Sequence, residues 1–93
     1  MREPRAAFAH DAKNTIGSIG SLRELIALDP DDPEVQQDRL ALQEAQNQLA
    51  KAVREALETG LIADGEAATL LGDDTVAAAT LALSIARSST QAQ

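Results

Sequence analysis

The chain has 93 residues, a net charge of −7 at neutral pH and a composition that is 44% apolar but only 1% aromatic. A chain of this length supports one small domain, and its richness in alanine and leucine predicts an all-α fold. The negative charge argues against nucleic acid or an anionic membrane as a partner. The chain has no cysteine, so it has no disulfide and no thiolate site. With a single histidine as well, no metal or other cofactor is expected in this chain.

The first expected helix spans residues 5–28. Its apolar side chains recur every three or four residues and define one stripe, which consists of Phe8, Ala12, Ile16, Ile19, Leu22 and Ile26. Such a stripe is the side of an amphipathic helix that packs on a neighbour. Residues 29–33, with the sequence Asp-Pro-Asp-Asp-Pro, break this helix and predict a tight connection.

The second expected helix spans residues 33–59. Asp32 is suited to be its N-cap, with Pro33 at the first helical position, and Gly60 supplies a stop. The apolar side of this helix consists of Val35, Leu42, Leu49, Ala52, Val53, Ala56 and Leu57. Two helices joined by so short a connection are expected to form an antiparallel hairpin.

Two shorter helices are expected at residues 64–71 and 74–87, with aspartates at their starts. The apolar side of the last helix consists of Val76, Ala79, Leu83 and Ile85, and the polar residues 88–93 are expected to fray. The hairpin is expected to form a four-helix bundle by homodimerisation, with the short helices at its end. The alternative is a monomer in which the last helices complete the bundle within one chain.

His10 is the only histidine, and it lies near the start of the first helix. At ~100° per residue, the stripe residues Phe8, Ile19 and Ile26 lie about 160–180° away, so the imidazole is expected to face solvent. The side of the helix within about 60° of the histidine, here named the His10 strip, consists of His10, Lys13, Asn14, Gly17, Ser21, Glu24, Leu25 and Leu28. Glycine inside a helix costs roughly 1 kcal/mol relative to alanine, so Gly17 and Gly20 predict close approach of another surface.

The side chains around His10 suit the transfer of a phosphoryl group. A neutral imidazole is a nucleophile, and part of any exposed histidine is neutral near neutral pH. Asp11 is expected to orient the ring through a hydrogen bond, whereas Lys13 and Asn14 are expected to contact phosphate oxygens. The expected docking surface for a partner protein consists of Gly17, Ser21 and Glu24. A solvated histidine without a function is the competing interpretation.

The run His10-x-x-Lys13-Asn14-Thr15-Ile16, followed by Ile19 and Ser21-Leu22, resembles the phospho-acceptor helix of sensor histidine kinases of the HWE type. That pattern reads His-Arg-Val-Lys-Asn-Thr-Leu, so the chain departs from it at Asp11 and Ala12. The resemblance implies a dimerisation and histidine-phosphotransfer domain. It implies that His10 is the phospho-acceptor, that Asp11 is its acidic neighbour, and that Asn14 is associated with dephosphorylation of the regulator.

A weaker resemblance is to histidine phosphotransfer domains, whose motif is His-x-x-Lys-Gly followed by Ile-Gly or Leu-Gly. His10-x-x-Lys13 and Ile19-Gly20 match this motif, whereas Asn14 stands where it has glycine. Such monomeric bundles usually have a further helix before the histidine, and here nine residues precede it.

Both resemblances imply a two-component phosphorelay protein that exchanges a phosphoryl group between His10 and an aspartate of a response-regulator receiver domain, which supplies its own Mg²⁺. The chain is expected to be either a histidine phosphotransferase or the core of a sensor kinase. It shows no ATP-binding domain, so an upstream histidine kinase or hybrid kinase is expected as a partner. The alternative function is a non-catalytic dimerisation or adaptor module. A cytoplasmic location is expected, because no apolar run approaches the ~18 residues of a membrane-spanning helix.

Overall fold

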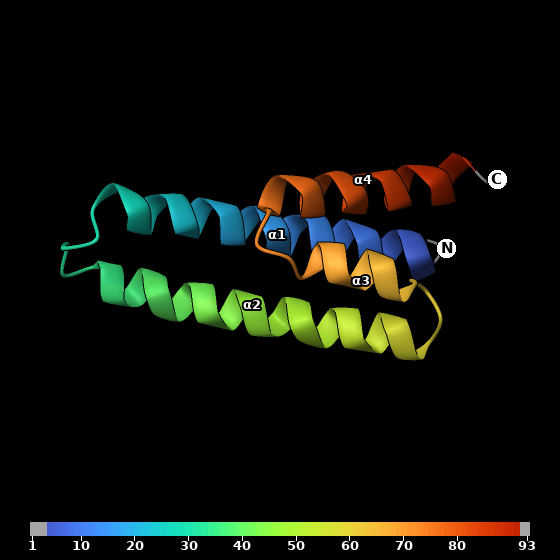
Figure 1. Cartoon of the computed structure of the whole chain (residues 1–93), viewed down its shortest axis with the longest axis horizontal. Helices are drawn as coiled ribbons and strands as arrows, with labels where there is room; N and C mark the ends of the chain where they lie inside the picture. The colour runs from blue at the N-terminus through green and yellow to red at the C-terminus, as the bar shows by residue number, and fades with distance from the viewer. Residues whose placement is uncertain (1–3, 92–93) are drawn as a thin grey trace.

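The computed structural model describes residues 4–91, and these residues form four helices and no strand. The helices are α1 (Pro4–Leu28), α2 (Val35–Glu58), α3 (Asp64–Leu70) and α4 (Thr75–Gln91). Figure 1 shows α1 and α2 as a long antiparallel hairpin, with α3 and α4 beside one end of it. The predicted all-α bundle is confirmed. Over this described range, every helix is too short or too polar to cross a membrane.

The connection between α1 and α2 is organised by Asp32. Its carboxylate accepts the backbone N–H of Glu34 at 2.9 Å, and its carbonyl accepts the backbone N–H of Val35 at 2.9 Å. This turn occupies the positions at which the sequence predicted the first helical residues. The predicted start at Pro33 was therefore wrong by two residues, because α2 begins at Val35 with Glu34 as its N-cap.

The end of α2 depends on Gly60. This glycine has a φ of +76°, in the left-handed region that residues with a side chain rarely adopt. Its N–H bonds to the carbonyl of Leu57 at 3.1 Å, and the N–H of Leu61 bonds to the carbonyl of Ala56 at 2.8 Å. These two bonds form a Schellman motif, so Gly60 ends the helix as the sequence predicted.

Acidic side chains cap the two short helices. The Asp74 carboxylate accepts the N–H groups of Val76 and Ala77, each at 3.1 Å, at the start of α4.

The predicted end of α3 was one residue late, since it ends at Leu70. The last helix continues to Gln91 instead of ending at residue 87, because no glycine or proline interrupts it. Residues 88–91 belong to this helix, and residues 92–93 lie outside the described range.

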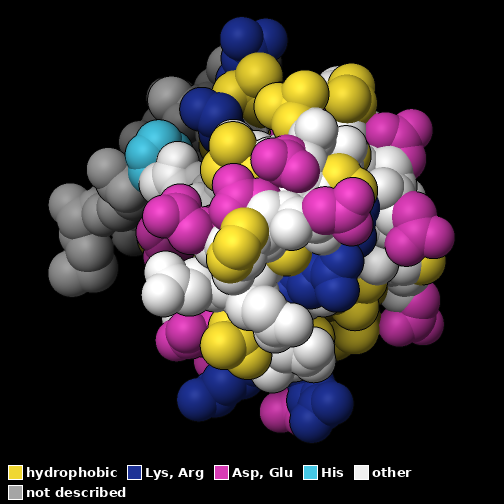
Figure 2. All heavy atoms as spheres, turned by 90° about the vertical axis from the view of Figure 1, so that its left-hand side faces the viewer, with side chains coloured by type: hydrophobic (Ala, Val, Ile, Leu, Met, Phe, Trp, Pro, Cys, Tyr) yellow, Lys and Arg dark blue, Asp and Glu magenta, His cyan; other side chains and the backbone are white. Residues whose placement is uncertain are grey.

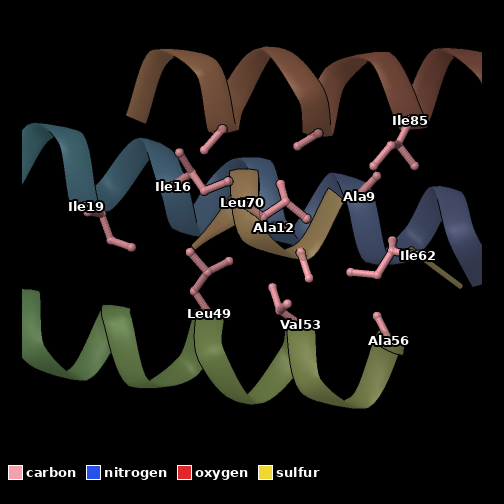
Figure 3. Close-up of a cluster of buried hydrophobic side chains, with 13 residues drawn as sticks. Ala9, Ala12, Ile16, Ile19, Leu49, Val53, Ala56, Ile62, Leu70 and Ile85 are labelled. Atoms are coloured by element: carbon pink, nitrogen blue, oxygen red, sulfur yellow. The ribbon is translucent and has the colours of Figure 1, made fainter. Parts of the chain in front are cut away.

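Helix α1 packs against two neighbours, α2 and α4, and α3 contacts both α2 and α4. The core draws side chains from all four helices and from the α2–α3 connection, as Figure 3 shows. It consists of Ala9, Ala12, Ile16, Ile19, Leu49, Val53, Ala56, Ile62, Ala67, Leu70, Ala78, Ala82 and Ile85. Of the predicted stripe of α1, Ala12, Ile16 and Ile19 lie in the core and Phe8 packs against it, whereas Leu22 and Ile26 are only half-buried. Helices α2 and α4 of the same chain cover the core part of the stripe.

The buried side of α4 differs from the predicted one. Ala78, Ala82 and Ile85 are at most 2% exposed, whereas Val76 is 75% exposed. The prediction of Val76 on the buried side was wrong, whereas Ile85 is buried as predicted and Ala79 and Leu83 are half-buried. The structure instead turns the small alanines of α4 toward α1, where two backbones can approach closely and still exclude voids.

Helices α3 and α4 cover only part of the hairpin. Helix α4 begins beside Gly20, where an added Cβ would lie 3.6 Å from the hydroxyl oxygen of Thr75. We name residues 4–20 and 49–58 the covered half of the hairpin, and residues 21–48 the free half. Within the free half only Val35 is buried. Figure 2 looks onto the end of the free half and shows acidic side chains spread over it.

Candidate functional site

The His10 strip is solvent-exposed along its whole length. All eight of its residues are exposed: His10, Lys13, Asn14, Gly17, Ser21, Glu24, Leu25 and Leu28. The neighbouring Ala9 and Ala12 are buried, since α4 and α2 flank α1 on its other sides. The predicted exposure of the histidine is therefore confirmed, and it follows from the 3.6-residue period of the helix.

The polar side chains of the strip have no partners among residues 4–91. No hydrogen bond or ion pair within that range involves the side chains of His10, Lys13 or Asn14. The two hydroxyl groups nearby are already used, because Thr15 donates to the carbonyl of Asp11 at 3.1 Å and Ser18 donates to the carbonyl of Asn14 at 3.3 Å. The imidazole, the ammonium group and the amide are thus all available to an external ligand.

Asp11 lies on the side of α1 that faces α2 and not beside the imidazole. Its side chain lines a shallow recess of about 320 Å³ between the two helices, together with Phe8, Glu55 and Thr59. No hydrogen bond within the described chain joins the Asp11 carboxylate to the His10 ring. Successive helical residues are ~100° apart, which separates the two side chains. The expected role of Asp11 in orienting the ring is not realised in this arrangement.

The two glycines of α1 have different surroundings. An added Cβ at Gly20 would meet Thr75 of α4, whereas one at Gly17 would meet nothing within 4 Å. The close approach expected from both glycines therefore occurs within the chain at Gly20 alone. Gly17 leaves open space on the strip, one turn beyond Lys13 and Asn14, where a partner's surface can come near the helix backbone.

The sequence did not reveal the ion pair that fixes the start of α1. The Arg5 guanidinium donates to the carbonyl of Leu61 and to the Glu66 carboxylate, the latter at 3.1 Å. The backbone N–H of Ala63 is the main cause that lowers the pKa of Glu66; burial opposes this effect, and the Arg5 guanidinium lowers the pKa further. A glutamate three residues into a helix is a recognisable capping signal, but its pairing with a residue far away in sequence is not.

Among residues 4–91, no group of three or more histidine, cysteine, aspartate or glutamate side chains is placed to hold a metal ion. Comparison with known protein families, curated proteins and solved structures finds no match.

Proposed function

We propose that this protein is a phosphorelay component that accepts a phosphoryl group on His10 and exchanges it with an aspartate of a response-regulator receiver domain. The observation that supports this most is the exposed, unpartnered imidazole in the run His10-x-x-Lys13-Asn14, which resembles a phospho-acceptor helix. A core histidine would be buried and hydrogen-bonded. Exposure thus excludes a role in the core, and it is the surrounding run that favours a phospho-acceptor over a solvated histidine without a function.

The reaction needs only groups that the two proteins supply. The unprotonated ring nitrogen of His10 attacks the phosphorus of the receiver's aspartyl phosphate. A nitrogen–phosphorus bond forms as the bond between phosphorus and the aspartate oxygen breaks, and the aspartate leaves as a carboxylate. The reverse step returns the phosphoryl group to that carboxylate. The Mg²⁺ that balances the phosphoryl charge is expected on the receiver.

Lys13 and Asn14 are the helpers nearest to the histidine on the exposed side of α1. Lys13 would stabilise the charge on the phosphoryl oxygens, and Asn14, one turn after His10, would hydrogen-bond a phosphoryl oxygen or an attacking water. Asp11 has no such place in the proposal, because its carboxylate faces α2. Gly17, Ser21 and Glu24 continue the exposed strip and offer a surface for the receiver.

The proposal includes an upstream histidine kinase or hybrid kinase, a cytoplasmic location and a homodimer. Ile16 and Ile19 are 2% and 3% exposed within one chain, so a second copy would have to pack elsewhere. The large apolar side chains exposed on the free half are Leu25, Leu28 and Leu40. Sedimentation over a range of concentrations tests this part, and a monomer throughout would remove the dimer while leaving phosphotransfer to be tested separately.

The direct test is phosphoryl transfer from a panel of receiver domains charged with radiolabelled acetyl phosphate. We expect label on the wild-type chain that is stable in base and lost in acid, as a nitrogen–phosphorus bond is. His10→Gln should carry none, whereas Glu44→Gln, a matched change on the exposed side of α2, should be labelled like the wild type. Circular dichroism would establish that both variants fold.

Two results would overturn the proposal. One is label that persists in His10→Gln, which would place the phosphate on another residue. The other is a wild-type chain that acquires no label from any receiver, or from histidine kinases with ATP. Stable binding of a receiver without label, equally by the wild type and His10→Gln, would support the adaptor function instead.

A further inference from the structure

A cavity of about 370 Å³ lies at the boundary between the covered half and the free half of the hairpin. Its floor is the apolar core, with Ile16, Ile19 and Leu49 from the hairpin and Leu70 from α3. Figure 3 shows Ile19 of α1 and Leu49 of α2 pointing toward one another near Leu70. The cavity exists because α3 ends at Leu70 and the chain crosses to α4 there, which leaves the groove between α1 and α2 unfilled.

The mouth of this cavity carries one cation. Arg23 is the only basic residue among those that line it, and its guanidinium donates to the backbone carbonyl of Asp73 at 2.9 Å. No carboxylate within the described residues forms an ion pair with Arg23. A guanidinium has five N–H donors in a planar fork, so this single bond fixes the group while most of its donors stay free.

The other polar groups that line the cavity affect whether an anion can bind there. Asp73 is the only acid in the lining, and it is exposed, whereas Arg23 is half-buried, so water screens the aspartate more strongly than the guanidinium. Gln46, Asn47 and Thr75 also line the cavity. Their side chains make no hydrogen bond within the described chain and can donate to an anion as well.

We propose that this cavity binds a small amphiphilic carboxylate, with its apolar chain on Ile16, Ile19, Leu49 and Leu70 and its carboxylate on Arg23. The apolar floor can pack against the hydrocarbon chain, and a guanidinium without an ion-pair partner can form a bidentate pair of hydrogen bonds with a carboxylate. The volume lies at the low end of the range of small-molecule sites, roughly 300–1,000 Å³, which favours a short chain over a long lipid. This site is separate from the His10 strip and does not depend on phosphotransfer.

The test measures binding of linear carboxylates of increasing length to the full chain by calorimetry, with octanoate as the reference probe. Each added methylene should raise the affinity by up to about fourfold until the cavity is full, after which the affinity should stop rising. Octanoate should bind at least about tenfold more tightly than 1-octanol or octylamine, because a charge-assisted pair forms with the carboxylate alone.

Two substitutions in the cavity and one control outside it test where the ligand binds. Arg23→Gln should reduce the affinity for octanoate to about that for 1-octanol, whereas Arg39→Gln, the same change at an exposed position outside the cavity, should leave it unaltered. Ala50→Phe, which fills the mouth from the half-buried side of α2, should abolish binding of both probes. The comparison of head groups on the wild type does not depend on how any variant folds.

Several outcomes would overturn the inference. Absence of octanoate binding would do so, as would equal affinity for octanoate and octylamine or equal losses in Arg23→Gln and Arg39→Gln. A concentration-dependent dimer that Ala50→Phe abolishes would show that a side chain of a second copy fills the cavity instead.

Discussion

The two halves of the α1–α2 hairpin lie in different environments. In the covered half, α1 lies between α2 and α4, and Ala9, Ala12, Ile16 and Ile19 are all buried. In the free half, α1 has α2 as its only helical neighbour, and Val35 is the single buried residue among positions 21–48. A helix pair alone buries its inner stripe only partly, and a third helix completes the burial.

Because of this difference, the buried side of α1 stabilises the fold, whereas its exposed side is available to a partner. The covered half provides most of the buried apolar area and should hold the fold, whereas the free half leaves apolar and acidic side chains in contact with water. The His10 strip extends across both halves on the side that no helix covers. A partner that bound the strip would therefore contact a helix flanked by α2 and α4 at His10, and by α2 alone near Leu28.

The largest expected difference between the halves is in the cost of removing an apolar side chain. Ile16→Ala should lower the free energy of unfolding by about 2–4 kcal/mol, because Ile16 is fully buried and its loss leaves a cavity. Leu28→Ala should cost less than about 0.5 kcal/mol, since Leu28 is 81% exposed. Urea denaturation followed by circular dichroism measures both. Equal losses would mean that a second copy covers the free half in solution.

Substitutions at two glycines, one on the covered half and one just after it, should change stability by an intermediate amount. Gly60→Ala should destabilise the protein by about 1–2 kcal/mol, because its φ of +76° is strained for alanine. Gly17→Ala should stabilise it by about 0.5–1 kcal/mol, because the position is helical and open. Thermal unfolding of the two variants measures the opposite signs. A destabilising Gly17→Ala would show that another surface already contacts the strip in the free protein.

The smallest expected effect concerns the ion pair that holds α1 to α3. The pKa of Glu66 is lowered in the folded protein, so its stabilising contribution is present above the pKa of an unfolded glutamate and is lost as pH falls through the folded value. Glu66→Gln should therefore destabilise the protein by less than about 1 kcal/mol at neutral pH and leave it unaffected in strong acid. Denaturation at several pH values measures this.

The control for that measurement is Glu58→Gln, which removes the same charge from an exposed position at the end of α2 with no ion pair among the described residues. Its effect on stability should be smaller than that of Glu66→Gln near neutral pH. A difference between the wild type and Glu66→Gln that grows as the pH falls would contradict the stabilisation of the Glu66 carboxylate by the Ala63 N–H and Arg5.

The fold was largely predictable because its signals are local. The three- and four-residue spacing of Ala12, Ile16 and Ile19 sets the buried side of α1, and Gly60 ends α2 through its own backbone geometry. The same periodicity placed His10 in solvent. The predictions were wrong where one local pattern allowed two structures. The Asp32 side chain forms a turn and not the N-cap of α2, and α4 buries alanines and not Val76.

The sequence alone therefore determined the presence of the four helices, most of the inner sides of α1 and α2 and the exposure of the His10 strip, because all of these follow from residues a few positions apart. Only the tertiary structure decided which helix covers α1, that Arg5 pairs with Glu66, and that Asp11 lies against α2. It also decided the cavity beside Arg23, which arises where α3 ends against the hairpin. These features depend on contacts between distant segments, and many sequences with the same local periodicity could form them differently.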